Sequence, residues 1–328
     1  MVLNLTPDYH EAERKYRQAS TTDEKLAALE EMLRTIPKHK SSEKKQSDLK
    51  RKIKELKEDV QRPAKKGATL DPYHIPSQGA GQVLLFGLPN SGKSSIVGRL
   101  TKAPVKITEF PFGTPLPVPG MAFHEDVPIE LVDLPPVTPE HIPGGMINAL
   151  RNGQVVAVVV DLAASSVLED VDTLLNILTE KEITTFAGMD DDEEEMAIGP
   201  RSLIVCTKAD LPGASDNLAV LKELRPAEPV MLPVSSVTGE GLVEMMCRMF
   251  TMLDSIRVYS KEPGKPADKS KPFILPAGST VEELARSIHK DLADKLRFAR
   301  VWGDHIFAGQ QVQGRHVLHD RDIVELHE

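Results

Sequence analysis

With 328 residues, of which 40% are hydrophobic and 27% charged, the chain has the length and composition of a globular protein with two or three domains. The net charge is −9, and the two cysteines, Cys206 and Cys247, lack the spacing of a disulfide framework or a zinc site. The longest apolar run, Val155 to Leu162, cannot cross a bilayer and the polar N-terminus is unlike a signal peptide, so we expect a cytoplasmic protein with no membrane contact.

The first segment, residues 1–66, is polar and has a helical pattern. Apolar residues recur every three or four positions from Leu26 to Ile36 and again from Leu49 to Val60, which predicts two amphipathic helices packed as a hairpin. A linker at residues 67–80, interrupted by Pro and Gly, separates this hairpin from the next domain.

The second predicted helix lies in a strongly basic stretch. Lys38 to Lys66 holds twelve Lys or Arg residues against five Asp or Glu, although the whole chain is acidic. Charge runs of this kind are usually solvated helix faces, but the local excess also suits contact with RNA phosphates. We favour RNA, and the candidate contacts are Lys44, Lys45, Lys50, Arg51, Lys52 and Lys54.

Between residues 81 and 256, apolar strands alternate with helical stretches. This alternation predicts an α/β fold in which helices cover both faces of a doubly wound, mostly parallel sheet. The expected strands are Val83 to Phe86, Ile129 to Leu134, Val155 to Leu162, Leu203 to Thr207 and Val230 to Val234.

The first of these strands runs into a glycine-rich loop, Gly87 to Ser94, of sequence GLPNSGKS. Glycines at both ends let the backbone fold around anionic oxygens, and the loop amides and the following helix N-terminus point at them. Lys93 is expected to reach the β and γ phosphates of a nucleoside triphosphate, and Ser94 to bind Mg²⁺. The residues expected around the phosphates are Gly87, Pro89, Asn90, Ser91, Gly92, Lys93, Ser94 and Ser95.

Asp133 ends the next predicted strand. A doubly wound NTPase places there the carboxylate that anchors the Mg²⁺ shell through water. The alternative is a turn aspartate without a ligand, which the preceding phosphate loop disfavours.

Two later motifs indicate the base. Thr207 to Asp210, of sequence TKAD, resembles the guanine-recognition motif Asn/Thr-Lys-x-Asp of small GTPases. The Asp210 carboxylate can accept both N–H donors of the guanine edge, and the Lys208 stem can lie along the ring, whereas adenine lacks that donor pair. The next strand is closed by Ser235, Ser236 and Val237, which resemble the last GTPase motif. We therefore expect GTP or GDP as the ligand.

Residues 110–120, of sequence FPFGTPLPVPG, resemble the switch I segment Phe-Thr-Thr-Leu-x-x-x-Pro-Gly of the Obg-related developmentally regulated GTP-binding (DRG) proteins. Phe112, Thr114 and the closing Pro-Gly pair match, while Gly113 replaces the first Thr of the segment. The resemblance implies that Thr114 binds Mg²⁺ and the γ-phosphate.

The resemblance extends to both ends of the chain. Leu33 to Lys40 and Asp48 to Ile53 are similar to the N-terminal helical region of that family. Gly278 to Glu282 and Ala299 to Gly303 are similar to its C-terminal TGS domain, a ubiquitin-like β-grasp module. The stretch between switch II and the guanine motif is too short for the domain inserted in eukaryotic members, so the chain is most similar to a compact prokaryotic-type member.

These features predict a GTPase domain at residues 81–256, a Lys-, Pro- and Gly-rich linker at 257–271 and a TGS domain at 272–328. The resemblance implies a GTP-hydrolysing regulatory protein that requires Mg²⁺. It also implies the ribosome or ribosomal RNA as a partner, with a protein partner at the TGS domain.

Two departures from the family affect the expected reaction. Where the family has Asp-x-Pro-Gly, this chain has Asp133 to Pro136, and Pro136 has no N–H to donate to the γ-phosphate. Val137 occupies the position where other GTPases carry the glutamine that orients water. We expect slow hydrolysis, and the alternative is a nucleotide-binding RNA or protein adaptor with an impaired switch.

Asn90 leaves two interpretations open. GTPases that resemble this chain in having Pro-Asn in the phosphate loop can hold K⁺ there, which places positive charge near the leaving oxygen. Alternatively, Asn90 braces the loop by a hydrogen bond to the backbone. The residues expected to contribute to hydrolysis are accordingly Lys93, Thr114 and Asn90.

Overall fold

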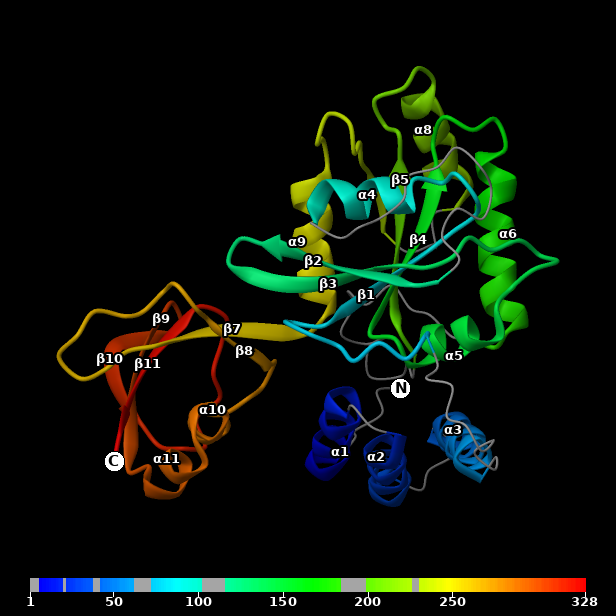
Figure 1. Ribbon diagram of the computed structural model, residues 1–328. Coiled ribbons are helices and arrows are strands. Elements are labelled where there is room, and N and C mark those ends of the chain that lie inside the picture. Colours follow the sequence, from blue (N-terminus) through cyan, green and yellow to red (C-terminus); the bar gives the residue numbers. More distant parts are fainter. Residues whose placement is uncertain are drawn as a thin grey trace.

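The computed structural model shows an α/β domain flanked by an N-terminal helical part and a C-terminal β-rich domain (Figure 1). The residues it describes are 6–19, 22–37, 42–61, 72–101, 116–183, 199–225 and 230–328. Among the helices within these ranges, none combines the length and the apolar composition needed to span a bilayer.

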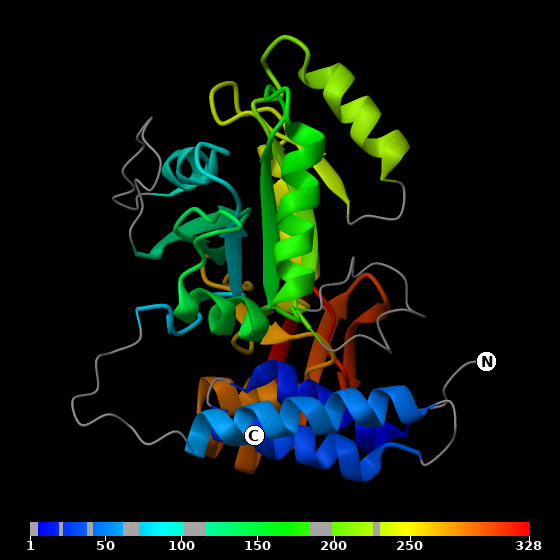
Figure 2. The same ribbon diagram turned by 90° about the vertical axis from the view of Figure 1, so that its right-hand side faces the viewer.

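The described N-terminal residues form three helices, α1 (Pro7–Gln18), α2 (Thr22–Thr35) and α3 (Glu43–Gln61). They lie side by side beneath the central domain in both ribbon views (Figures 1 and 2). Their shared core is built from Tyr9, Ala12, Leu29, Met32, Ile36, Leu49 and Ile53. The two predicted helices are α2 and α3, and the structure adds α1 ahead of them.

Helix α1 has an ordinary start signal that the apolar pattern did not reveal. Thr6 is its N-cap, and the Thr6 Oγ1 accepts a hydrogen bond from the Tyr9 amide at 3.2 Å. Pro7 follows at the first helical position, where its missing N–H has no consequence. Tyr9 and Ala12 are the residues that this helix contributes to the buried core. Two apolar positions are too few to identify an amphipathic helix from sequence.

Within the described ranges, the central sheet has six strands in the order β2-β3-β1-β4-β5-β6. They are β1 (Gln82–Phe86), β2 (Val118–His124), β3 (Val127–Asp133), β4 (Val155–Asp161), β5 (Arg201–Thr207) and β6 (Met231–Pro233). All neighbouring pairs are parallel except β2 and β3, which confirms the predicted mostly parallel sheet and its five expected strands. Strand β2 was not predicted.

Helices cover both faces of this sheet. The surrounding helices are α4 (Lys93–Leu100), α5 (Gly144–Asn152), α6 (Val167–Glu180), α8 (Ala214–Leu224) and α9 (Leu242–Met252). Apolar residues of α4 and α9, including Ile96 and Met249, pack with one set of strand side chains. Residues of α5, α6 and α8, including Met146 and Leu174, pack with the other set. The sheet is therefore doubly wound, as predicted.

Residues 255–327, all of them described, contain a second sheet of five strands in the order β10-β9-β11-β7-β8. Its elements are β7 (Ser255–Ser260), β8 (Phe273–Pro276), α10 (Val281–Ile288), α11 (Lys290–Lys295), β9 (Phe298–Gly303), β10 (Ile306–Val312) and β11 (Asp322–His327). Val281 and Leu284 of α10 pack on the sheet beside Val301 and Val324. This is the predicted small α+β domain, but β7 falls largely within the predicted linker at residues 257–271.

An ion-pair network joins the two sheets. Arg257 of β7 is 2% exposed, and its guanidinium contacts Asp126 at 2.8 Å, Glu125 at 2.5 Å and Asp320 at 3.1 Å. The Tyr259 hydroxyl donates to a second oxygen of Asp126 at 2.7 Å. Because Glu125 and Asp126 form the turn between β2 and β3, this network holds the central domain against the C-terminal domain.

The N-terminal helices contact both of the other parts. Arg14 of α1 donates to the Gly278 carbonyl at 2.9 Å and pairs with Glu283 at 3.2 Å. Lys25 of α2 donates to the Asn152 carbonyl at the end of α5, at 3.2 Å. The helical part therefore contacts the C-terminal domain and the end of α5 in the central domain.

Candidate nucleotide-binding site

Four loops meet at one edge of the central sheet. The phosphate loop follows β1, Asp133 ends β3, Thr207 ends β5 and Ser235 follows β6. These strands are parallel, so their carboxyl ends share the edge at which open α/β sheets bind ligands. The segments predicted to hold phosphate, magnesium and base are thus brought together.

The phosphate loop depends on its two glycines. A Cβ on Gly87 would lie 2.5 Å from the Val159 carbonyl oxygen and 2.8 Å from the Ser91 hydroxyl, so only glycine fits. Gly92 has a φ of +95°, and a Cβ there would meet Thr207 Oγ1 at 3.1 Å. The glycines therefore allow the loop to pass close to β4 and to the guanine motif, and Gly92 leads directly into α4.

The remaining loop residues differ in exposure. Ser91 is buried, Pro89 and Ser95 are half-buried, and Asn90 is exposed with a φ of +60°. Within the described part of the chain, the Asn90 side chain makes no hydrogen bond, which gives no support to the interpretation that it braces the loop.

Lys93 is held over the loop by backbone carbonyl groups. Its Nζ donates to the carbonyl oxygens of Gly87 at 3.0 Å and Leu88 at 2.9 Å. Burial lowers the pKa of Lys93 to about 8, and the nearby Asp133 carboxylate acts in the opposite direction. A bound phosphate carries a full negative charge, whereas the carbonyl oxygens carry only partial charges, so phosphate would stabilise the protonated form of Lys93 more strongly.

Ser94 and Asp133 form the predicted magnesium pair. The Ser94 hydroxyl donates to Asp133 Oδ2 at 2.5 Å, and the Asp133 side chain is almost completely buried. A hydroxyl and a carboxylate at one point are the hard oxygen donors that Mg²⁺ prefers, so these two residues fit the ion. Thr114, the third predicted ligand, lies outside the described residues, as do Phe112 and Gly113.

The segment after Asp133 is tied to the phosphate loop. The Val137 amide donates to the Gly87 carbonyl at 3.3 Å, and both Pro136 and Val137 are buried. The two residues that depart from the family pattern are thus placed next to the loop that would surround the phosphates.

The guanine motif is anchored to the phosphate loop and to β4. Thr207 Oγ1 lies 2.7 Å from the Ser91 carbonyl oxygen and 3.0 Å from that of Val160. Lys208 has a φ of +57°, and its ammonium group pairs with Asp161 at the end of β4. The Asp210 side chain is exposed, as a base-reading carboxylate would be before ligand binds.

Asp161 is a site residue that the motif analysis missed. It occupies the last position of β4, and its carboxylate orients the lysine of the guanine motif. The available signal was an acid directly after a buried strand, which is the same signal that identified Asp133.

The last motif supports the site through its backbone. Ser235 is buried, and its hydroxyl oxygen accepts hydrogen bonds from the amides of Val237 at 3.2 Å and Thr238 at 3.0 Å. Ser236 is half-buried and Val237 is exposed. Ser235 therefore shapes the loop after β6, which is joined to the guanine motif by the Ala209 amide donating to the Val234 carbonyl at 3.1 Å.

The predicted RNA contacts in α3 divide into two groups. Lys45 is 4% exposed and lies over the Tyr9 ring at 4.8 Å, and Lys52 donates to the Tyr16 hydroxyl at 3.3 Å. The buried placement of Lys45 corrects its prediction as an RNA contact, and Lys52 is engaged within the helical part. Exposed cations in the predicted set are Lys50, Arg51 and Lys54, while the side chain of Lys44 is not among those described.

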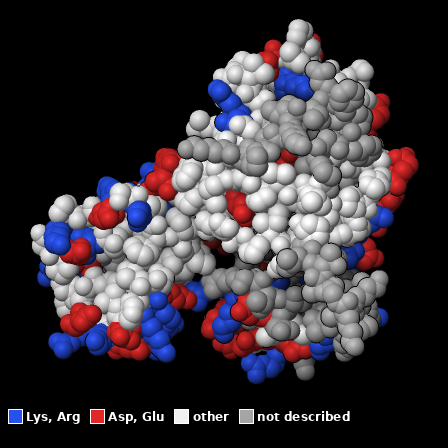
Figure 3. All heavy atoms as spheres, in the orientation of Figure 1, with Lys and Arg blue, Asp and Glu red and all other residues white. Residues whose placement is uncertain are grey.

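On the face drawn in Figure 3, the Lys and Arg residues of the helical part lie among Asp and Glu residues. Among the described residues, the cations of the helical part therefore do not form a single uninterrupted patch on that face. An RNA contact through α3 would depend on a few exposed cations.

A phosphate loop, a strand-ending aspartate and a TKAD loop at one sheet edge define a P-loop GTPase domain, here joined to a β-grasp domain. Residues 82–190 match the family described as 50S ribosome-binding GTPase, and residues 256–328 match the TGS domain. The solved structure of the YchF GTPase of Schizosaccharomyces pombe has a TM-score of 0.53 at 11% identity, covering 76% of this chain and 98% of that one. It supports the fold.

Relatives match over nearly the whole chain. An uncharacterized GTP-binding protein of Halobacterium salinarum is 26% identical, with 93% of this chain and 98% of that protein covered. Developmentally-regulated G-protein 2 of Arabidopsis thaliana is 26% identical, with 92% and 90% covered. Ribosome-interacting GTPase 1 of Saccharomyces cerevisiae is 25% identical, with 94% and 99% covered. The chain is thus a GTP-binding protein with a GTPase domain and a TGS domain, homologous to the DRG proteins and their archaeal relatives.

Proposed function

We propose that the protein is a slow, Mg²⁺-dependent GTPase that regulates a step of translation in the cytoplasm, through contact with the ribosome. The proposal rests on one observation, which is the convergence of Lys93, the Ser94–Asp133 pair and the TKAD loop at one sheet edge. The match to the 50S ribosome-binding GTPase family and the ribosome-interacting relative support the ribosomal part.

The residues of the site have separate roles in this proposal. Lys93 and the loop amides stabilise the negative charge that develops on the phosphates. Ser94 and Asp133, together with Thr114 from switch I, would hold Mg²⁺, which neutralises charge on the phosphate oxygens when bound. Asp210 selects guanine, and Lys208, positioned by Asp161, lies along the base.

The slow rate of hydrolysis follows from Pro136 and Val137, which come shortly after Asp133. Val137 has no group to orient the attacking water, and its amide is already engaged with Gly87. Pro136 has no N–H for the γ-phosphate. We propose that K⁺ at Asn90 supplies part of the missing positive charge, since the Asn90 side chain is exposed at the turn of the loop.

The test of this function begins with the nucleotide that copurifies with the protein, identified by chromatography after denaturation. Hydrolysis is then measured with GTP and ATP in K⁺ and in Na⁺ buffer, with and without Mg²⁺. We expect the copurified nucleotide to be GDP or GTP, and we expect the protein to hydrolyse GTP but not ATP. Hydrolysis should require Mg²⁺ and should be faster in K⁺ than in Na⁺. Equal binding of ATP and GTP would contradict guanine specificity, and equal rates in K⁺ and Na⁺ would contradict the role of Asn90.

The ribosomal contact is tested by sedimentation with ribosomes. We expect that replacing Lys50, Arg51 and Lys54 by Glu weakens co-sedimentation and its dependence on salt. A matched control replaces Lys222, Lys271 and Lys290 by Glu, three lysines that are also exposed and lie elsewhere in the chain. If both triple variants sediment like the wild type, α3 is not the RNA-binding surface.

The TGS domain offers a separate surface for a protein partner. Strand β10 lies at the edge of its sheet, and Phe307 on that strand is 86% exposed. An edge strand leaves one row of backbone N–H and C=O groups unpaired, and these can pair with a strand added by a partner. We expect Phe307→Ser to abolish partner capture without a change in GTP hydrolysis.

A second function, that of a nucleotide-binding RNA or protein adaptor with an impaired switch, is favoured by Pro136 alone. Pro136→Gly restores the backbone donor, so a slow GTPase would gain turnover and a larger difference between its GTP- and GDP-bound states. Turnover that stays undetectable in both forms, with ribosome binding independent of the nucleotide, would favour the adaptor.

A further inference from the structure

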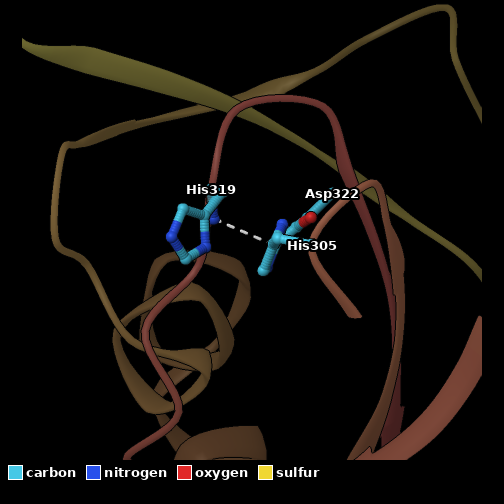
Figure 4. A group of neighbouring side chains, drawn as sticks. All are labelled: His305, His319 and Asp322. Carbon is cyan, nitrogen blue, oxygen red and sulfur yellow. Dashed lines mark hydrogen bonds and ion pairs between the residues drawn. The ribbon is translucent and has the colours of Figure 1, made fainter. Parts of the chain in front are cut away.

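Two histidines and an aspartate of the C-terminal domain converge far from the nucleotide site (Figure 4). His305 lies in the turn between β9 and β10, His319 in the loop before β11, and Asp322 at the first position of β11. Their ligand-type atoms, two imidazole nitrogens and a carboxylate oxygen, all lie within 4.8 Å of one another. The His305 and His319 rings are 3.7 Å apart between centroids.

The backbone fixes the carboxylate at the centre of this group. Asp322 Oδ2 accepts a hydrogen bond from the His319 amide at 2.9 Å, and the Asp322 amide donates to the His319 carbonyl at 3.2 Å. Gly303 provides the space, because a Cβ there would lie 2.1 Å from Asp322 Oδ1 and 3.1 Å from a ring carbon of His305. The position of Asp322 is therefore built into the fold, while the two imidazoles are exposed and can rotate.

The charge of Asp322 is incompletely compensated by the described residues. Its side chain is fully buried, and Oδ1 has no hydrogen-bond partner among them. The ion pair between Asp322 Oδ2 and His305 Nε2 spans 3.7 Å, which is too long for a hydrogen bond. A fully buried carboxylate with one oxygen left unpaired carries a desolvation cost. A cation between the carboxylate and the imidazoles would remove this penalty.

We propose that His305, His319 and Asp322 bind a divalent transition-metal ion, with Zn²⁺ as the representative of the class. Imidazole nitrogens select borderline metals such as Zn²⁺ over Mg²⁺ and Ca²⁺, which prefer oxygen ligands. Ligands of a tetrahedral zinc are about 3.3 Å apart, so small rotations of the exposed rings close the present separations. Three protein ligands leave one position for water or for a donor group of a partner.

A bound ion would join two parts of the domain that are separate in sequence, the turn that carries His305 and the start of β11. It would connect the turn before β10, the loop before β11 and the first residue of β11, and so would fasten one end of the TGS sheet. His316 belongs to the same loop, and its buried Nε2 has no partner among the described residues. His316 therefore adds a further polar side chain to the loop that carries His319.

The test measures Zn²⁺ affinity of the full chain by competition with a chromophoric chelator, with GDP and Mg²⁺ present to occupy the nucleotide site. All forms carry Cys247→Ser, because this exposed thiol could bind zinc itself. We expect one equivalent of Zn²⁺, and affinity reduced by about tenfold or more in His305→Gln, in His319→Gln and in the double variant. The matched control is His74→Gln, another exposed histidine, which should bind as tightly as the parent.

A second measurement separates metal binding from a structural role of the cluster. Co²⁺ should give the visible absorption of nitrogen and oxygen ligation, and Zn²⁺ should raise the Tm of the parent but not of the double variant. If the double variant binds Zn²⁺ like the parent, or if the parent binds none, the proposal is wrong. A double variant that is only less stable, with Zn²⁺ affinity unchanged, would show that the cluster serves as an ion pair and would equally overturn it.

Discussion

At the level of single residues, burial sets the charge behaviour of Lys93. The side chain is 5% exposed and its ammonium group is held by the carbonyls of Gly87 and Leu88. Burial removes the ammonium group from water and lowers the pKa of Lys93 to about 8, while the Asp133 carboxylate acts in the opposite direction. The nucleotide-free site therefore holds a lysine whose proton is unusually easy to remove.

This pKa predicts a pH dependence of stability. Because the folded-state pKa of about 8 lies below the ordinary value of 10.5, unfolding takes up a proton in this window, and the Lys93 contribution to the free energy of unfolding rises with pH. Without nucleotide, we expect the wild type to gain stability relative to Lys93→Met between about pH 8 and pH 10. Urea unfolding at several pH values checks this. Parallel curves for the two proteins would contradict it, and bound GDP should abolish the difference.

The exposed carboxylate of Asp210 predicts a change in base selection. Asp210→Asn exchanges an acceptor pair for an acceptor and a donor, so GTP affinity should fall by about 10- to 100-fold, while affinity for the xanthosine nucleotide should rise. Competition binding with GTP, XTP and ATP measures the effect. Asp216→Asn, an equally exposed aspartate in the first turn of α8, serves as the control and should leave all three affinities unchanged.

At the level of elements, the guanine motif at the end of β5 is hydrogen-bonded to the phosphate loop that follows β1. Thr207 at the end of β5 bonds the Ser91 carbonyl of the phosphate loop, and Gly92 leaves the space for it. The phosphate and guanine motifs are therefore mechanically joined before any nucleotide is present. The sequence alone shows the two motifs but not this bond.

Removal of that bond should affect both motifs at once. Thr207→Val keeps the shape and removes the hydroxyl that lies near the carbonyls of Ser91 and Val160, so we expect a loss of about 1–3 kcal/mol in the free energy of unfolding and weaker GTP binding. Thr251→Val is the control, since that hydroxyl bonds only the Cys247 carbonyl of its own exposed helix turn. Unchanged GTP affinity in Thr207→Val would show that the loops are independent.

How much could be read from the sequence also differs between elements. The phosphate loop and its glycines were predictable because a motif of fixed spacing demands their backbone geometry. The pairing of Lys208 with Asp161 was not, because it depends on β4 and β5 being neighbours, which is a property of the sheet order. Strand β2 contains Pro119 and Gly120, which obscure a strand pattern, and β7 adjoins a Pro- and Lys-rich loop that hides its alternation.

At the level of the whole molecule, one buried arginine connects the two sheets. Arg257 forms ion pairs with three carboxylates from two different loops. Its hydrogen bond to Glu125 lowers the pKa of that carboxyl group. A lowered carboxyl pKa contributes its full stability above the ordinary value, and this contribution is lost as the pH falls from there through the lowered value. The domain contact should accordingly weaken in acid.

The arginine gives a direct test of the domain contact. Arg257→Ala removes all three ion pairs from a buried position, and we expect a loss of about 2–4 kcal/mol, with the C-terminal domain becoming easier to cleave from the central domain. Arg286→Ala is the control, because its pair with Glu282 is exposed on one helix and should be worth about 0.3–0.5 kcal/mol. Denaturant unfolding and limited proteolysis measure the two effects. Equal losses in both variants would mean that the network does not hold the domains together.

The β2–β3 hairpin connects the nucleotide site to the contact between the two domains. At one end, Val118 pairs with Asp133, which accepts the Ser94 hydroxyl, and at the other end Glu125 and Asp126 form ion pairs with Arg257. Seven paired residues form a rod of about 23 Å that resists stretching. The same hairpin therefore contacts the nucleotide site through Asp133 and the second sheet through Arg257, which makes it the direct structural connection between them.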